Sequence, residues 1–140
     1  MELKITTSRI TEPITRDGKQ TGEISFDPAD LAFVEGFVSL IDRYQKLLLE
    51  IKAERTKPDG DIRNYLALVR KVSETLCTSI DEIFGEGTSK AAFGGIPASP
   101  DVFAQFFDWA TDQITASRAP YISKYLPADE EGAEQADGLE

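Results

Sequence analysis

The residue types that usually carry catalysis or bind metals are sparse in this sequence. It contains no histidine, so it lacks the commonest general base and the commonest zinc ligand. Cys77 is its only cysteine, which rules out an intrachain disulfide and a thiolate cluster. Its neighbours Leu76 and Ile80 favour a small buried apolar residue over a nucleophile. We therefore expect no enzymatic activity, no cofactor and no metal site.

Other motifs that could bind a ligand or carry out chemistry also have simpler interpretations. The segment 85–95 is rich in glycine, but a Walker loop needs Gly-Lys-Ser/Thr after a strand. Here the order is Thr-Ser-Lys and a helix precedes it, so we expect a connector between helices, or less simply a protein-docking loop. Asp59-Gly60-Asp61 is too short for a calcium loop. Asp81 and Glu82 are adjacent on a helix and point in different directions, so solvated carboxylates are expected.

An aromatic group near the C-terminal end is the remaining candidate. Phe103, Phe106, Phe107 and Trp109 recur at helical spacing, which favours a core position. If part of the group is exposed, it becomes the best candidate for anchoring a partner protein. The candidate partner-binding residues are Phe93, Phe103, Phe107 and Trp109.

Composition restricts the class of protein. The 140 residues are enough for one domain with a real core, and the net charge is −10. That charge disfavours nucleic acid and anionic membranes as partners, because both require clustered Lys and Arg. Basic or apolar protein surfaces remain plausible targets. The sequence offers neither a signal-peptide core nor a membrane-spanning run, so we expect a cytoplasmic protein.

One long amphipathic helix organises the chain. We predict it from Asp27 to Arg55, with Asp27 as its N-cap and Pro28 at the first helical position. Its apolar residues alternate steps of three and four and face two neighbouring elements: Val34, Phe37, Ile41, Tyr44, Leu48 and Ile51, widened by Phe33, Leu40 and Leu47. Gly36 in the middle predicts a close approach by a neighbour.

Further helices follow. A second helix over residues 61–84 carries Ile62, Leu66, Val69, Leu76, Ile80 and Ile83 at the same spacing. The short turn 57–60 predicts an antiparallel helical hairpin. A third helix begins at Ser99 or Asp101, and Pro120 divides it from a last short segment. The fold class is thus mainly α, with a helical hairpin and a third helix.

The two ends differ from this pattern. Residues 2–10 and 20–26 read as extended runs around Asp17-Gly18, which predicts a β-hairpin or an extended arm over residues 1–26. Beyond Pro127 the sequence has six carboxylates and no base, which predicts a disordered, solubilising acidic tail over 128–140. Residues 1–127 would then form a single domain.

Taken in order, these parts resemble the tail assembly chaperones of tailed phages and prophages of Gram-positive bacteria. The residues that carry the resemblance are Phe33-Val-Glu-Gly-Phe37 through Tyr44, then Ile80 to Lys90 with Phe93-Gly94, and finally Phe103 to Phe107 with Tyr125-Leu-Pro127. The similarity covers residues 1–127. These motifs reflect packing and turns, so no functional residue is transferred from the family.

The resemblance implies a non-catalytic role in the cytoplasm of the host cell. Such proteins are thought to bind the helix-rich tape-measure protein, to recruit tail-tube protein and to leave before the virion is complete. Homo-oligomer formation and a frameshifted longer form are left open. The alternative is a structural tail or head-completion component whose N-terminal arm adds a strand to a neighbour's sheet.

Overall fold

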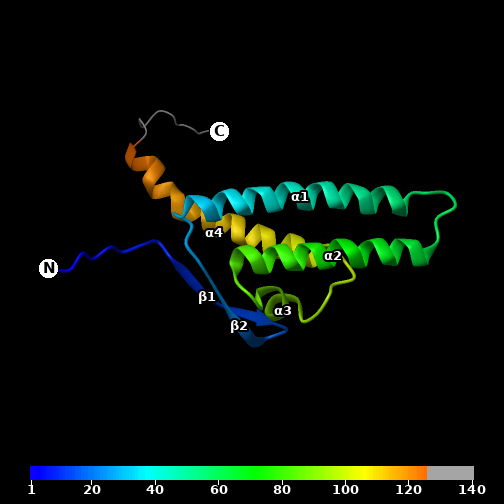
Figure 1. The fold of residues 1–140 in the computed structure, drawn as a ribbon, viewed down its shortest axis with the longest axis horizontal. Helices are drawn as coiled ribbons and strands as arrows, with labels where there is room; N and C mark the ends of the chain where they lie inside the picture. Colours follow the sequence, from blue (N-terminus) through cyan, green and yellow to red (C-terminus); the bar gives the residue numbers. More distant parts are fainter. Residues whose placement is uncertain (126–140) are drawn as a thin grey trace.

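A helical hairpin and a third long helix form the body of the protein (Figure 1). The computed structural model describes residues 1–125, with side chains through residue 117. The elements are β1 (Ile10–Arg16), β2 (Lys19–Phe26), α1 (Leu31–Arg55), α2 (Ile62–Phe84), α3 (Thr88–Phe93) and α4 (Asp101–Tyr125). The predicted fold class, mainly α with a minor β part, is confirmed. The predicted acidic tail lies outside the described residues.

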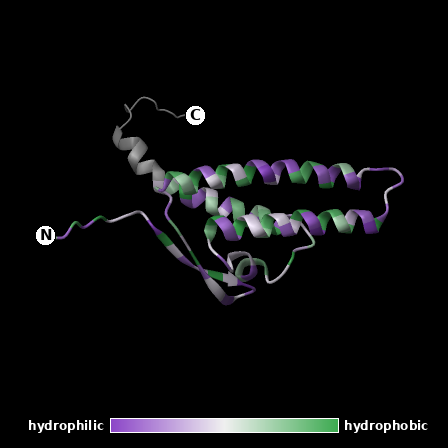
Figure 2. Cartoon of the chain, in the orientation of Figure 1, coloured by the Kyte–Doolittle hydropathy of each residue, from purple (hydrophilic) through white to green (hydrophobic). Residues whose placement is uncertain are grey.

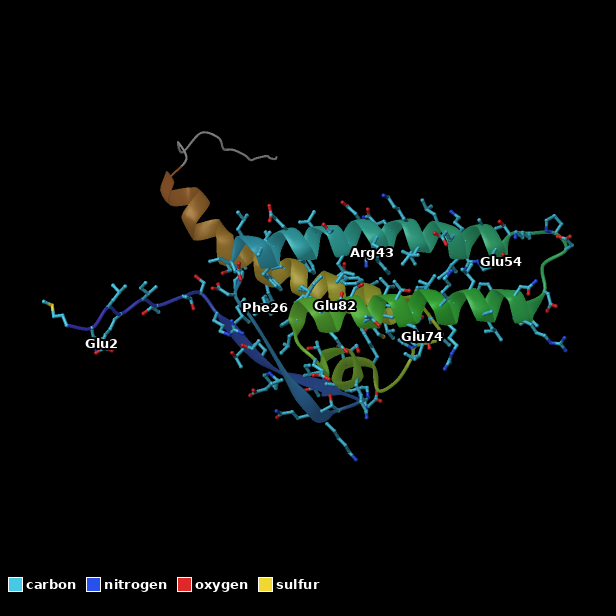
Figure 3. The ribbon with its side chains drawn as sticks, viewed as in Figure 1. Glu2, Phe26, Arg43, Glu54, Glu74 and Glu82 are labelled. Atoms are coloured by element: carbon cyan, nitrogen blue, oxygen red, sulfur yellow. The ribbon has the colours of Figure 1, made fainter. Side chains whose placement is uncertain are left out.

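The helices α1 and α2 run antiparallel (Figure 1), and hydrophobic and hydrophilic residues alternate along both of them (Figure 2). Phe37, Leu40 and Ile51 of the predicted stripe are buried in the core. Arg43 reaches across to α2, where its Nη1 donates to Ser79 Oγ at 2.9 Å (Figure 3). The pair thus forms the predicted helical hairpin.

Helix α1 begins three residues later than the sequence predicted. The N-cap is Asp30, whose side chain accepts from Ala32 N at 3.0 Å. Asp27, the predicted cap, instead accepts from Ala29 N at 2.9 Å in the preceding turn. Pro28 is fully buried in that turn. Two capping residues stand three positions apart, and the chain uses both of them in succession.

The two strands form an antiparallel ribbon around Asp17 and Gly18, which have φ of 55° and 83°. Positive φ at both central residues matches the type I′ turn that Asp-Gly favours. The first strand was predicted over residues 2–10 but lies at 10–16, because Ile10 and Ile14 pack against the core while Leu3 and Ile5 are exposed. Pro13 is accommodated in β1 because a two-stranded ribbon leaves each strand one unpaired edge.

Helix α4 begins at Asp101, one of the two predicted start positions, and Asp101 N donates to Oγ of Ser99, the other, at 3.3 Å. It continues through Pro120 to Tyr125, so the predicted division at Pro120 is wrong. A proline inside a helix removes one hydrogen bond and bends the axis without necessarily ending it. Phe103, Phe106, Phe107, Ala110 and Ile114 of α4 are buried against the hairpin.

Gly36 of α1 faces Ile83 of α2, but Ile83 does not approach closely enough to require a glycine there. A methyl group added at Gly36 would lie 3.7 Å from Ile83 Cδ1, which is ordinary van der Waals contact. We therefore expect Gly36→Ala to stabilise the protein by about 0.5–1 kcal/mol, because alanine has the higher helix propensity. Urea denaturation followed by circular dichroism measures this difference. A loss of stability would show that the helices are closer in solution than 3.7 Å implies.

Candidate functional site

A hollow of the described surface lies between the β-ribbon and the helices α3 and α4. Its volume is about 620 Å³, within the range of ligand pockets. We call it the aromatic groove. Its lining is formed by Pro13, Ile14, Thr15, Arg16, Asp17, Ile24, Ala92, Phe93, Val102, Gln105, Phe106 and Trp109. Apolar and aromatic side chains dominate, and the charged residues Arg16 and Asp17 lie at the turn end of β1.

Helix α3 forms one wall of the groove because two other elements hold it in place. At its N-terminus Ser89 N donates to Asp81 Oδ1 of α2 at 2.8 Å. Asp81 is therefore a capping residue rather than the solvated carboxylate that was expected. The predicted connector between helices does contain a helical turn, and its position is fixed from α2.

The β-ribbon holds the other end of α3. Arg16 Nη1 donates to the carbonyl oxygens of Lys90 at 3.2 Å and Ala91 at 3.0 Å, and Thr21 Oγ1 donates to Ala91 O at 2.6 Å. The pairing skips Thr21, since Ile14 pairs with Gly22 and Thr15 with Gln20. This bulge directs Thr21 towards α3. Sequence reasoning missed both contacts, which join residues at least 70 positions apart.

The structure separates the four predicted partner-binding residues into two pairs. Phe93 and Trp109 line the aromatic groove and are half-buried. Phe103 and Phe107 are only 1% and 3% exposed. Phe103 packs against Phe93 at 4.9 Å between ring centroids, and Phe107 packs against Tyr44 at 4.8 Å. We therefore withdraw Phe103 and Phe107 as partner-binding candidates, because the core already covers them.

Trp109 is held at the rim by an aromatic network. Its ring meets Phe26 of β2 edge-on at 6.0 Å, and Phe26 in turn packs against Phe33 at 5.1 Å and Phe84 at 5.4 Å. Edge-to-face pairs at such distances are favourable and directional. The groove is thus a preformed apolar surface with few polar groups, which suits docking of apolar side chains better than acid–base chemistry.

Cys77 is buried as expected, at the contact between α2 and α3. Burial raises the pKa of its thiol, and the charges of Asp81 and Glu74 raise this pKa further. A hydrogen bond with Ser89 lowers the pKa by a smaller amount than burial raises it. A nucleophilic cysteine needs the opposite shift. Cys77 therefore fits a packing role.

This raised pKa predicts a dependence of stability on pH. The folded protein binds the thiol proton more tightly than the unfolded chain, so this contribution is complete below the ordinary pKa of 9.0. It is lost as the pH rises from there through the folded-state pKa. We expect the urea midpoint to fall above pH 9, and to fall less steeply in Cys77→Ala.

Tyr44 supplies the control for that measurement. Burial raises its pKa above 10.0, and the charges of Asp101 and Asp108 raise it further. Tyr44→Phe should therefore change the slope only above pH 10. Equal slopes in wild type and Cys77→Ala between these two pH values would show that the thiolate is tolerated in the core.

The described residues contain no group of three or more His, Cys, Asp or Glu placed to hold a metal ion. Asp61, from the short acidic motif, caps α2 by accepting from Arg63 N at 2.9 Å. In the same part of the chain, no helix combines the length and the apolar character that crossing a bilayer requires.

The fold defines a small helical domain with a β-ribbon and an apolar, aromatic-lined groove. The chain belongs to DUF6673, a family of unknown function, whose model matches residues 20–136. The match includes β2 except its first residue, the four helices of the described residues and the helical side of the aromatic groove. No curated protein and no solved structure matches the chain.

Proposed function

We propose that this protein is a phage tail assembly chaperone that binds the tape-measure protein in the host cytoplasm and aids assembly of the tail tube without catalysing a reaction. The sequence resemblance over residues 1–127 supports it. The observation that carries it is the aromatic groove, with Phe93 and Trp109 at its surface.

The chemistry of the groove fits a helical client. An amphipathic helix binds by placing apolar residues at i, i+3 or i+4, and i+7 into an apolar surface. Ile14, Phe93, Val102 and Trp109 provide such a surface from three sides, over a floor formed by the buried Ile24 and Phe106. Large aromatic side chains such as Trp109 also dominate binding energies at protein interfaces. A client with many similar helical repeats would bind several copies and gain avidity.

Co-expression tests the proposal. The full chain and a helical fragment of the tape-measure protein from the same genome should form a soluble complex that survives size-exclusion chromatography. We expect Trp109→Ala to weaken the complex at least ~10-fold, as for an interface hot spot. Val38→Ala is the matched control, because Val38 is exposed on α1 and lies outside the groove. Equal affinities of wild type and Trp109→Ala would contradict the groove as the binding site.

A structural component of the virion is the second candidate, and the N-terminal arm supports it. Residues 1–9 precede β1 and extend away from the body (Figure 3). Leu3 and Ile5 are 83% and 75% exposed and alternate with polar residues, as in a strand that adds to a neighbour's sheet. A chaperone should be absent from purified virions. A structural component should be present in them, and deletion of residues 1–9 should prevent its incorporation.

A further inference from the structure

Helix α4 covers only part of the α1–α2 hairpin. The segment that leads into α4 crosses the hairpin at two hydrogen bonds, from Ser73 Oγ to Pro97 O at 2.9 Å and from Tyr44 Oη to Pro100 O at 3.4 Å. From there α4 runs back towards the N-terminus of α1, and the end of the hairpin near the turn projects beyond it (Figure 1). The covered side of the hairpin therefore continues into an uncovered part.

The uncovered part continues the apolar stripes of the core. On α2, Ile62 and Leu66 lie eleven and seven residues before Ser73 and share its face, yet they are 66% and 51% exposed. On α1, Leu48 lies one turn beyond Tyr44 on the same face and is half-buried. We call this surface the distal face. It comprises Leu48, Lys52, Arg55, Ile62, Leu66 and Arg70.

The distal face is basic, in contrast to the rest of the protein. Residues 43–71 contain eight Lys or Arg and four Asp or Glu, whereas the remaining residues sum to −14. Two of the four carboxylates in 43–71 are engaged: Glu54 pairs with Lys57 at 3.0 Å, and Asp61 caps α2. Arg70 itself pairs with Glu74 at 3.5 Å on the exposed surface of α2. Lys52 and Arg55 follow Leu48 at four and seven residues, and Arg70 follows Leu66 at four. These cations therefore flank the exposed apolar residues.

We propose that the distal face binds an acidic amphipathic helix of a partner protein. Its apolar stripe would cover Leu48, Ile62 and Leu66, and its carboxylates would lie beside Lys52, Arg55 and Arg70. A helix is the expected occupant because α4 already packs on the adjoining part of the same two helices. An acidic one is expected because the cations outnumber the carboxylates there. This inference does not depend on the proposed phage function.

A designed peptide tests the inference on the full chain. The probe is a fluorescent helical peptide of about 20 residues, with Leu at i, i+3, i+4 and i+7 and Glu elsewhere; a second peptide has Lys in place of Glu. Fluorescence anisotropy should show at least ~10-fold tighter binding of the acidic peptide, an advantage that added salt reduces. Leu66→Asp and Arg55→Glu should each weaken binding ~10-fold or more.

Lys46→Glu is the matched control. It changes the net charge as much as Arg55→Glu does, but it lies two residues from Leu48 and points to the other side of α1. Lys46, Arg55 and Leu66 are all exposed, so the three variants at these positions should retain the wild-type melting temperature. Trp109→Ala should keep full affinity for the peptide, which separates failure of this inference from failure of the proposed function.

Several outcomes would overturn the proposal. Equal binding of the two peptides, or equal losses in Lys46→Glu and Arg55→Glu, would reduce it to non-specific attraction. A dimer of the free protein that Leu66→Asp converts to a monomer would make the distal face a contact between copies. Cross-links between this face and residues 128–140 of the same chain would make the acidic segment its occupant. Binding of single-stranded nucleic acid that depends on Arg55 but not on Leu66 would replace a protein partner.

Discussion

Replacing Phe84 with alanine is expected to destabilise the protein by about 3–5 kcal/mol, a large part of the stability of an ordinary domain. Phe84 is buried at the end of α2. Its ring contacts Phe26, Phe33, Phe37 and Phe106 at centroid distances of 5.1–5.9 Å, mostly edge-on. The side chain thus joins β2, α1 and α4 to α2. Removal of the Phe84 ring leaves a cavity that β2, α1 and α4 cannot all move in to fill.

Urea denaturation followed by circular dichroism and tryptophan fluorescence measures this loss. Ile62→Ala is the control within the same helix: its side chain is largely exposed, so a change of no more than about 0.5 kcal/mol is expected. Trp109 packs against Phe26, which also contacts the ring of Phe84, so its emission should also report the change. A loss at Phe84 no larger than that at Ile62 would show that the aromatic cluster does not hold the elements together.

Replacing Gly22 with valine is expected to cost about 1–3 kcal/mol and to open the aromatic groove. A Cβ at Gly22 would lie 2.9 Å from Cβ of Ala91, closer than two such carbons approach. Helix α3 cannot move aside freely, because Thr21 and Arg16 both donate to the carbonyl oxygen of Ala91. The clash therefore separates the β-ribbon from α3. Nuclear magnetic resonance spectra should show changes confined to these elements and the groove.

A second substitution tests that explanation directly. Ala91→Gly removes the atom that valine at position 22 would meet, and by itself it should cost about 1 kcal/mol of helix propensity. The double variant should be more stable than the sum of the two single effects predicts. Strict additivity would show that Gly22 is needed for another reason, such as the backbone conformation beside the bulge.

The helical hairpin was determined by local sequence. The apolar stripes of α1 and α2 repeat over many residues and the turn 57–60 separates them, so periodicity and turn chemistry agree. The Asp17-Gly18 turn was equally clear, because few residues adopt positive φ. Where signals were short or duplicated they failed. Asp27 and Asp30 are both good caps, and residues 2–10 and 10–16 are both reasonable strands, so only packing selects between them.

Tertiary structure alone decided which apolar residues are available to partners. Phe93, Phe103, Phe107 and Trp109 look alike in sequence, but the core covers two of them and leaves two beside the β-ribbon. Ile62 and Leu66 have the spacing of a buried stripe and yet are exposed. The reason is that α4 runs away from the turn end of the hairpin, where they lie (Figure 1). Helical spacing states which residues share a face. Only the length and placement of elements distant in sequence decide whether that face is covered.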